Sequence, residues 1–214
     1  MAIENSLDAV LNSKTKVKII RLFISRTSAF RVSGRDIARL INVSPPATHA
    51  ALKELQSLNI LRLEIIGKQH IYSLNDKNRI VKDILKPGFE KELSIKEDIK
   101  NFLNSRIKET GIRKYLISVI LYGSLQRNQT DNRSDVDIAV IVRDKNDKKE
   151  IENKFIENIG VEFREYFGVH LDAYVKSKEE FINRMRKHLS PVESLMKSYS
   201  VIFGEDPLDF IQSL

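Results

Sequence analysis

Two aspartates one residue apart stand where a buried strand is expected to begin. Asp135 and Asp137 come just before the apolar run 138–142 (IAVIV). The β-branched composition of this run is typical of a strand covered on both faces. Carboxylates in such a place are costly to desolvate unless a cation lies against them. Because alternate residues of a strand share a face, we expect both carboxylates to point the same way.

Two other strand-like runs bring further polar groups toward these aspartates. The run 116–122 is followed directly by Gly123-Ser124, and the run 169–175 carries Asp172 in its middle. The chain has no cysteine, so a metal would be held by oxygen or imidazole ligands. Three carboxylates facing a glycine-serine turn suit Mg²⁺ or Mn²⁺, and backbone N–H groups of such a turn can receive a phosphate. The pattern therefore predicts a site for a divalent cation and a nucleoside triphosphate.

At this point the chain resembles a known family. Gly123-Ser124, followed after ten residues by Asp135-Val136-Asp137, is similar to the signature of nucleotidyltransferases of the DNA polymerase beta superfamily. The small, stand-alone type of this family is the nearest match, and the resemblance covers roughly residues 95–210, including Asp172. It implies transfer of a nucleoside monophosphate from an NTP, with ATP the first candidate, to a hydroxyl acceptor.

The resemblance also assigns roles to individual residues. Asp135, Asp137 and Asp172 would hold the metal, Mg²⁺ or Mn²⁺, and Asp172 would in addition help to deprotonate the acceptor. The phosphate-binding residues would be Gly123, Ser124 and Arg127. Asn128 departs from the family pattern, in which glycine often follows the arginine, and this affects the expected loop rather than the metal site.

The excess positive charge lies in the first part of the chain. The formal net charge is +7, and residues 1–90 hold 15 Lys and Arg against 8 Asp and Glu, whereas residues 91–214 hold 21 of each kind. A basic module joined to a neutral one favours contact of the N-terminal part with a polyanion. A solvated basic surface with no ligand is the alternative.

The same N-terminal part has the pattern helix, helix, turn, helix, hairpin. Helical spacing covers residues 13–27, a second helix contains Ile37, and Ser44 is the expected N-cap of a helix over 45–58. Two strand-like runs then meet at Gly67-Lys68. Over residues 10–76 this order resembles the winged helix-turn-helix of archaeal and bacterial regulators, which implies duplex DNA as a partner. The implied DNA-binding residues are Arg35, Arg39, Pro46, His49, Lys53, Lys68 and Gln69.

Together these patterns predict an α+β protein of two domains. Residues 1–88 would form the winged helix-turn-helix, 89–112 a linker helix after a helix break at Pro87-Gly88, and 113–214 a nucleotidyltransferase domain with a mixed β-sheet flanked by helices. No apolar run is long enough to cross a membrane and no signal pattern opens the chain, so we expect no membrane partner and a cytoplasmic location.

A second interpretation comes from a different class of function. The chain would then be a DNA-binding transcriptional regulator whose nucleotidyltransferase-fold domain senses nucleotide or binds a partner protein. Relatives of the resembled type are often antitoxins, which implies a helical, toxin-like protein from an adjacent gene as a partner. The sequence is compatible with a monomer and with a homodimer. The sequence does not identify the acceptor or the DNA sequence bound.

Overall fold

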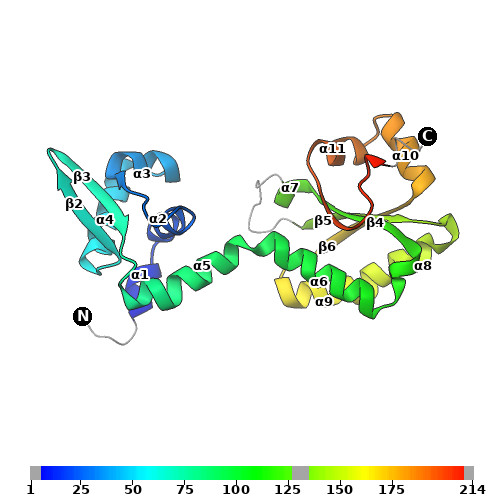
Figure 1. The fold of residues 1–214 in the computed structure, drawn as a ribbon, viewed down its shortest axis with the longest axis horizontal. Coiled ribbons are helices and arrows are strands. Elements are labelled where there is room, and N and C mark those ends of the chain that lie inside the picture. Colours follow the sequence, from blue (N-terminus) through cyan, green and yellow to red (C-terminus); the bar gives the residue numbers. More distant parts are fainter. Residues whose placement is uncertain (1–5, 127–134, 210–214) are drawn as a thin grey trace. The chain divides into compact units, whose positions relative to one another are not determined.

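The chain folds into two compact units. The computed structural model describes residues 6–126 and 135–209, and the units are Met1–Ile95 and Lys96–Leu214 (Figure 1). In the described part, no helix combines the length and the apolarity needed to cross a membrane.

The first unit contains helices packed on a small antiparallel sheet with strand order β1-β3-β2. Its elements are α1 (Ser6–Leu11), α2 (Lys14–Ile24), β1 (Val32–Ser33), α3 (Gly34–Ile41), α4 (Pro45–Ser57), β2 (Leu61–Ile66) and β3 (Gln69–Leu74). The predicted hairpin is confirmed, because Ile66 pairs with Gln69 across a turn in which Gly67 has a φ of +59°. Glycine adopts this left-handed conformation without the penalty that a Cβ brings.

The helices of the first unit begin and end at recognisable signals. Ser13 caps α2 by accepting from the Thr15 N–H at 3.2 Å, and Ser33 caps α3 by accepting from the Asp36 N–H at 3.2 Å. Ser44 occupies the predicted N-cap position of α4, and Pro45 is the first helical residue, as expected. The Ser44 side chain makes no capping hydrogen bond, so it fills the position without the usual contact.

The helix break predicted at Pro87-Gly88 is also wrong. Helical backbone runs through this point, from the π-helical turn η1 (Val81–Leu85) into α5 (Lys86–Leu93), with Pro87 in the first turn of α5. A proline disrupts a helix because it lacks an N–H and crowds the preceding turn. The wider π-type turn directly before it relieves that conflict. Helix α5 is tied to α2 by Arg21, which donates to both carboxylate oxygens of Glu92 at 2.9 and 3.0 Å.

The second unit is built on a four-stranded mixed sheet with strand order β6-β5-β4-β7. Strands β5 and β6 are parallel, and the other neighbours are antiparallel. Its elements are α6 (Ile95–Glu109), η2 (Ile112–Tyr115), β4 (Leu116–Tyr122), α7 (Gly123–Gln126), β5 (Val136–Val142), η3 (Lys145–Asp147), α8 (Lys148–Asn153), η4 (Lys154–Ile159), α9 (Gly160–Phe167), β6 (Leu171–Ser177), α10 (Lys178–Arg186), α11 (Val192–Lys197) and β7 (Ser200–Gly204).

Helices cover both faces of this sheet, as the apolar strands predict. On β5, Ile138 and Val140 pack in a core with α6 and α9, whereas Ala139 and Ile141 pack in a second core with α10 and α11. Helix α6 differs from its predicted role as a linker: its apolar stripe, centred on Leu103, is part of the first of these cores. The division between the units accordingly falls at residues 95 and 96 rather than at 88.

Candidate active site and nucleic-acid interface

Two of the predicted acidic residues lie side by side on neighbouring strands. Asp137 on β5 is the register partner of Asp172 on the parallel strand β6, and Tyr122 at the end of β4 is the register partner of Asp137 on the other side. Paired residues of adjacent strands are about 5 Å apart and share a face of the sheet. The row Tyr122–Asp137–Asp172 therefore crosses three strands on the face that α10 and α11 cover further along.

Gly123 is fitted to this row. It has a φ of +80°, and a Cβ built on it would overlap the carboxylate of Asp137, with the Asp137 Cγ only 2.7 Å away. Both the backbone conformation and the space thus require glycine. The consequence is that the backbone leaving β4 runs directly against the Asp137 carboxylate, and Ser124, half-buried in α7, follows at once.

The charge of the row acts on Tyr122. Burial raises the pKa of the Tyr122 phenol, and the negative charges of Asp137 and then Asp172 raise it further. Both carboxylates therefore lie near one phenol whose residue is only 8% exposed. Carboxylates that share a site repel one another, and a cation placed between them relieves that repulsion.

The third predicted acid is placed differently. Asp135 precedes the first residue of β5 and, like Asp172, is exposed, and no group of three acidic, histidine or cysteine side chains is gathered closely enough to hold a metal within residues 6–126 and 135–209. Mg²⁺ is usually bound through one or two carboxylates, with waters and substrate phosphates as its other ligands. The oxygen donors of the Asp137–Asp172 pair fit such an ion. Asp135 lies two residues from Asp137 but is not gathered with the pair.

One predicted phosphate-binding residue, Arg127, lies outside the described residues. Gly123 lies against the Asp137 carboxylate, and Ser124 is the next residue of the chain, at the start of α7.

Four of the seven predicted DNA-binding residues line one groove of the first unit. This groove has a volume of about 770 Å³ and lies between the start of α3, the start of α4 and the β2–β3 hairpin. The four are Arg35, His49, Lys68 and Gln69. The other three, Arg39, Pro46 and Lys53, are exposed on α3 and α4 but do not line the groove.

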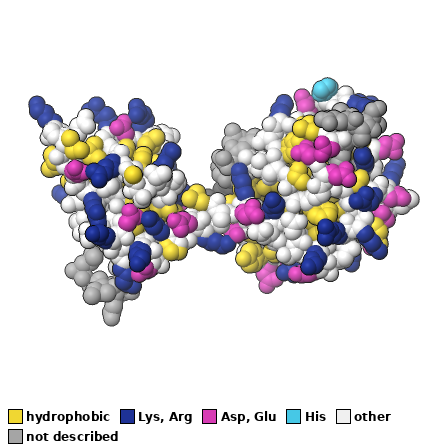
Figure 2. Space-filling model, viewed as in Figure 1, with side chains coloured by type: hydrophobic (Ala, Val, Ile, Leu, Met, Phe, Trp, Pro, Cys, Tyr) yellow, Lys and Arg dark blue, Asp and Glu magenta, His cyan; other side chains and the backbone are white. Residues whose placement is uncertain are grey.

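The two arginines of α3 differ in what they contact. Arg39 donates to Asp36 at 2.8 Å, one turn earlier in the helix, whereas Arg35 forms none of the ion pairs found among the described residues. Lys and Arg side chains are spread over the visible face of the first unit (Figure 2). An arginine that is not held in an ion pair is the one more readily given to a phosphate.

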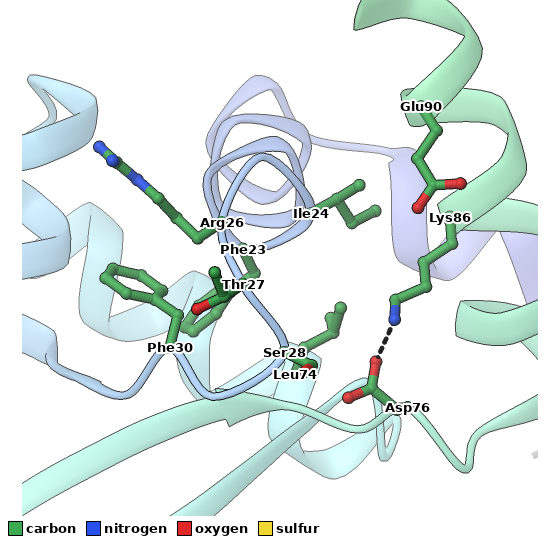
Figure 3. A pocket seen from close by; sticks show the side chains of 10 residues that line it. All are labelled: Phe23, Ile24, Arg26, Thr27, Ser28, Phe30, Leu74, Asp76, Lys86 and Glu90. Atoms are coloured by element: carbon green, nitrogen blue, oxygen red, sulfur yellow. Dashed lines mark ion pairs between the residues drawn. The ribbon is translucent and has the colours of Figure 1, made fainter.

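A smaller hollow of the first unit has a structural explanation. It measures about 210 Å³ and lies where α2 ends, with Phe23, Phe30, Asp76 and Lys86 among its lining residues (Figure 3). The Lys86 ammonium lies 2.6 Å from Asp76 Oδ1 and compensates the charge of that buried oxygen, although no hydrogen bond of good geometry reaches it. The pair connects α5 to the end of β3, and no predicted site residue lies here.

Sequence reasoning missed a cluster of cations beyond the acidic row. Tyr174 and Lys176 follow Asp172 on the same face of β6, and the Tyr174 ring lies under both the Lys176 ammonium, at 4.6 Å, and the Arg184 guanidinium, at 6.0 Å. The period-two spacing of residues 172, 174 and 176 was a usable signal. Lys148 and Arg184, which come from α8 and α10, had none.

Comparison with known proteins adds one family match. No curated protein sequence matches the chain. Among solved structures, one described as the crystal structure of a toxin-antitoxin with AMP-PNP is 13% identical, covers 53% of this chain and 85% of its own, and has a TM-score of 0.34. The structure of Lactococcus lactis ZitR, a C30AH42A mutant in apo form, is 17% identical, covers 76% of this chain and 98% of its own, and has a TM-score of 0.30. Residues 98–201, which include the whole row from Tyr122 to Asp172, match the family model of the nucleotidyltransferase domain.

Proposed function

We propose that the second unit transfers a nucleoside monophosphate from an NTP to a hydroxyl group and releases pyrophosphate. The observation that carries this proposal is the pairing of Asp137 with Asp172, with the Gly123 backbone directly against the Asp137 carboxylate. The match of residues 98–201 to the nucleotidyltransferase domain supports it.

In this proposal the chain positions two substrates on opposite sides of Asp137. Gly123 and Ser124, with Arg127, hold the triphosphate at the end of β4, and the acceptor approaches from the side of β6. The acceptor oxygen attacks the α-phosphorus, the bond from that phosphorus to the β-phosphate oxygen breaks, and the acceptor proton passes to Asp172. Asp137 and Asp172 would hold Mg²⁺ or Mn²⁺, which supplies positive charge to the phosphates, and Asp135 would have to move toward this pair to join them as a ligand. The first NTP to test is ATP.

We further propose that the first unit is a winged helix-turn-helix that binds duplex DNA. Helix α4 would enter the major groove by its N-terminal half, with Pro46 and His49 toward the bases and Lys53 toward the phosphates. The β2–β3 hairpin, with Lys68 and Gln69 at its turn, would be the wing. The groove that joins Arg35, His49 and the hairpin turn supports this arrangement.

A regulator is the second candidate function. In it, the first unit binds an operator, and the second unit senses nucleotide or binds a partner protein, such as a helical toxin-like protein from an adjacent gene. The basic groove of the first unit favours this candidate as strongly as it favours an enzyme that is brought to DNA.

Label transfer separates the two candidates. Incubated with Mg²⁺ or Mn²⁺, α-labelled ATP and either lysate or a co-expressed neighbouring protein, the chain is expected to transfer α-label and not γ-label. Transfer that persists unchanged in Asp137→Ala would reject the proposed site. Binding of ATP without transfer in any mixture would favour the regulator.

A further inference from the structure

Three cations meet around one aromatic ring on the face of the sheet that carries the acidic row. Lys176 on β6 and Arg184 on α10 both lie over the ring of Tyr174. Lys148, the first residue of α8, lies close enough to Lys176 to lower the pKa of that lysine. The three side chains come from three different elements, so tertiary folding and not local sequence brings them together.

The negative charge within this cluster is too small to balance them. Glu180 is the acid of the cluster: its carboxylate lies 3.3 Å from the Lys148 ammonium and also accepts from the Ser177 N–H at 3.0 Å. Burial alone would raise the pKa of Glu180, but that hydrogen bond and Lys148 lower it below its ordinary value. Among the described residues, no ion pair includes Lys176 or Arg184.

The arrangement works against the protein when nothing is bound. Burial lowers the pKa of Lys176, and the neighbouring charge of Lys148 lowers it further, so the two ammonium groups oppose each other in a half-buried position. The hydroxyl of Tyr174 is buried and has no hydrogen-bond partner among the described residues. Crowded cations and a polar atom without a partner are what an anion would correct.

The position of the cluster relates it to the acidic row. Lys176 is four residues from Asp172 on β6, which at the usual rise per residue of a strand is about 13 Å along the same face. Strand β6 is at one edge of the sheet, and β4, which delivers Gly123, lies on the other side of β5. The cluster is therefore on the side of the row away from the triphosphate in the proposed reaction.

We propose that Lys148, Lys176 and Arg184 form an anion site that takes a phosphate group of the acceptor substrate, about 13 Å from the acidic row. The anion site stands on the cluster itself, and its assignment to the acceptor rests on the proposed transfer reaction. An acceptor of this kind carries its reactive hydroxyl and a phosphate group at opposite ends of a span about as long as two nucleotide units. A phosphorylated small molecule of that length and the end of a single strand of nucleic acid share this chemistry.

Lysine reactivity tests the anion site directly on the full chain. Lysines are acetylated with an amine-specific reagent in inorganic phosphate and in sodium chloride of equal ionic strength, and modification is measured by mass spectrometry. Phosphate is expected to slow modification of Lys148 and Lys176 at least threefold. The matched control is Lys197, which is exposed and lies 3.8 Å from Glu193 in an isolated helical pair, and its modification is expected to stay unchanged. Equal protection of the three lysines, or none, would overturn the site.

A variant separates ligand binding from structure. Lys176→Gln removes one of the opposed cations, so the phosphate-dependent rise in melting temperature should shrink relative to that of Lys197→Gln, while the fold is retained in chloride. A rise that equals the one in Lys197→Gln would overturn the site.

Two further experiments test the anion site independently of the proposed transfer reaction and identify the kind of molecule that carries the phosphate. Protection of Lys176 should persist in Asp137→Asn, which abolishes transfer in the proposed reaction, so a chain without transfer activity can still pass this test. Nucleotide transfer without protection would reject the anion site alone. A trinucleotide that protects Lys176 at a hundredth of the effective phosphate concentration would identify a strand, and equal concentrations would identify a small phosphate ester.

Discussion

The two units place their candidate functional residues in opposite ways. In the first unit these residues are exposed side chains on helices α3 and α4 and on the hairpin, and they can be exchanged without disturbing the core. In the second unit they stand at strand ends, where a buried Gly123 lies against a half-buried Asp137, and Asp172 on the edge strand is exposed. A surface that binds through many phosphate contacts divides its affinity among them, whereas a catalytic row concentrates its effect in a few residues. Single substitutions should therefore have small effects in the first unit and large ones in the second.

The largest expected effect is the loss of nucleotide transfer in Asp137→Ala. Removing one carboxylate that holds the metal should reduce the transfer rate by roughly 10²–10⁴-fold, because several kcal/mol of transition-state stabilisation are lost. The rate is measured with α-labelled ATP. The control is Asp144→Asn at the opposite end of β5, where Asp144 accepts from the Asn146 N–H at 2.8 Å and asparagine can take over that cap. A similar loss in both variants would contradict the assignment.

A glycine pair measures how tightly the second unit is built around Asp137. Gly123→Ala should destabilise the unit by about 2–4 kcal/mol, since the new Cβ is strained at positive φ and also overlaps the Asp137 carboxylate. Gly168→Ala is the matched control: φ is +73° there, but no atom lies within 4 Å of the added Cβ, so only the strain remains. Both are measured by denaturant unfolding.

A double variant checks the cause of that difference. If the overlap with Asp137 is responsible, Asp137→Ala should recover part of the stability lost in Gly123→Ala and nothing of that lost in Gly168→Ala. Independent, additive effects in both pairs would show that Gly123 is required for backbone conformation alone.

Sequence patterns predicted the helices and strands well, and predicted their exact bounds and the contacts of single side chains less well. The strand over 116–122, the hairpin turn at Gly67-Lys68 and the helix from Pro45 follow from apolar spacing and turn residues, which act locally. The third strand was predicted over 169–175 but begins at Leu171, because the helix before it ends at a left-handed Gly168 and two residues are used to leave that turn.

The acidic row shows the same limit at the level of single side chains. Alternation along a strand placed Asp135 and Asp137 on one face, and the pairing of Asp137 with Asp172 depends on the register of two parallel strands, which the sequence does not encode locally. The exposed position of Asp135, the overlap that requires Gly123 and the approach of Lys148 to Lys176 are all consequences of tertiary packing.

On the first unit, the expected effect of one substitution is smaller and depends on its ion pairs. Arg35→Gln should reduce the slope of log affinity for duplex DNA against log salt by about 1, the value for one lost phosphate contact. Arg39→Gln should change it less, because the contact of Arg39 with Asp36 at 2.8 Å must be given up when DNA binds. Fluorescence anisotropy at several salt concentrations measures both slopes. An effect of Arg39→Gln equal to or larger than that of Arg35→Gln would contradict the ranking, and unchanged slopes in both would remove α3 from the DNA interface.

The smallest expected effect is confined to alkaline pH and to the second unit. Burial, the hydrogen bond that the Tyr199 hydroxyl donates to Asp206 at 2.6 Å, and the charge of that carboxylate together raise the pKa of Tyr199 to about 12. A raised folded-state pKa means that the unfolded chain loses the phenol proton first, so the stabilisation is complete below about pH 10 and is lost as the pH rises toward 12. Tyr199→Phe removes the hydrogen bond and should cost about 1 kcal/mol at pH 8. The gap between wild type and variant should then close between pH 10 and 12 in urea unfolding of the full chain. A gap that stays constant over this range would contradict the raised pKa of Tyr199.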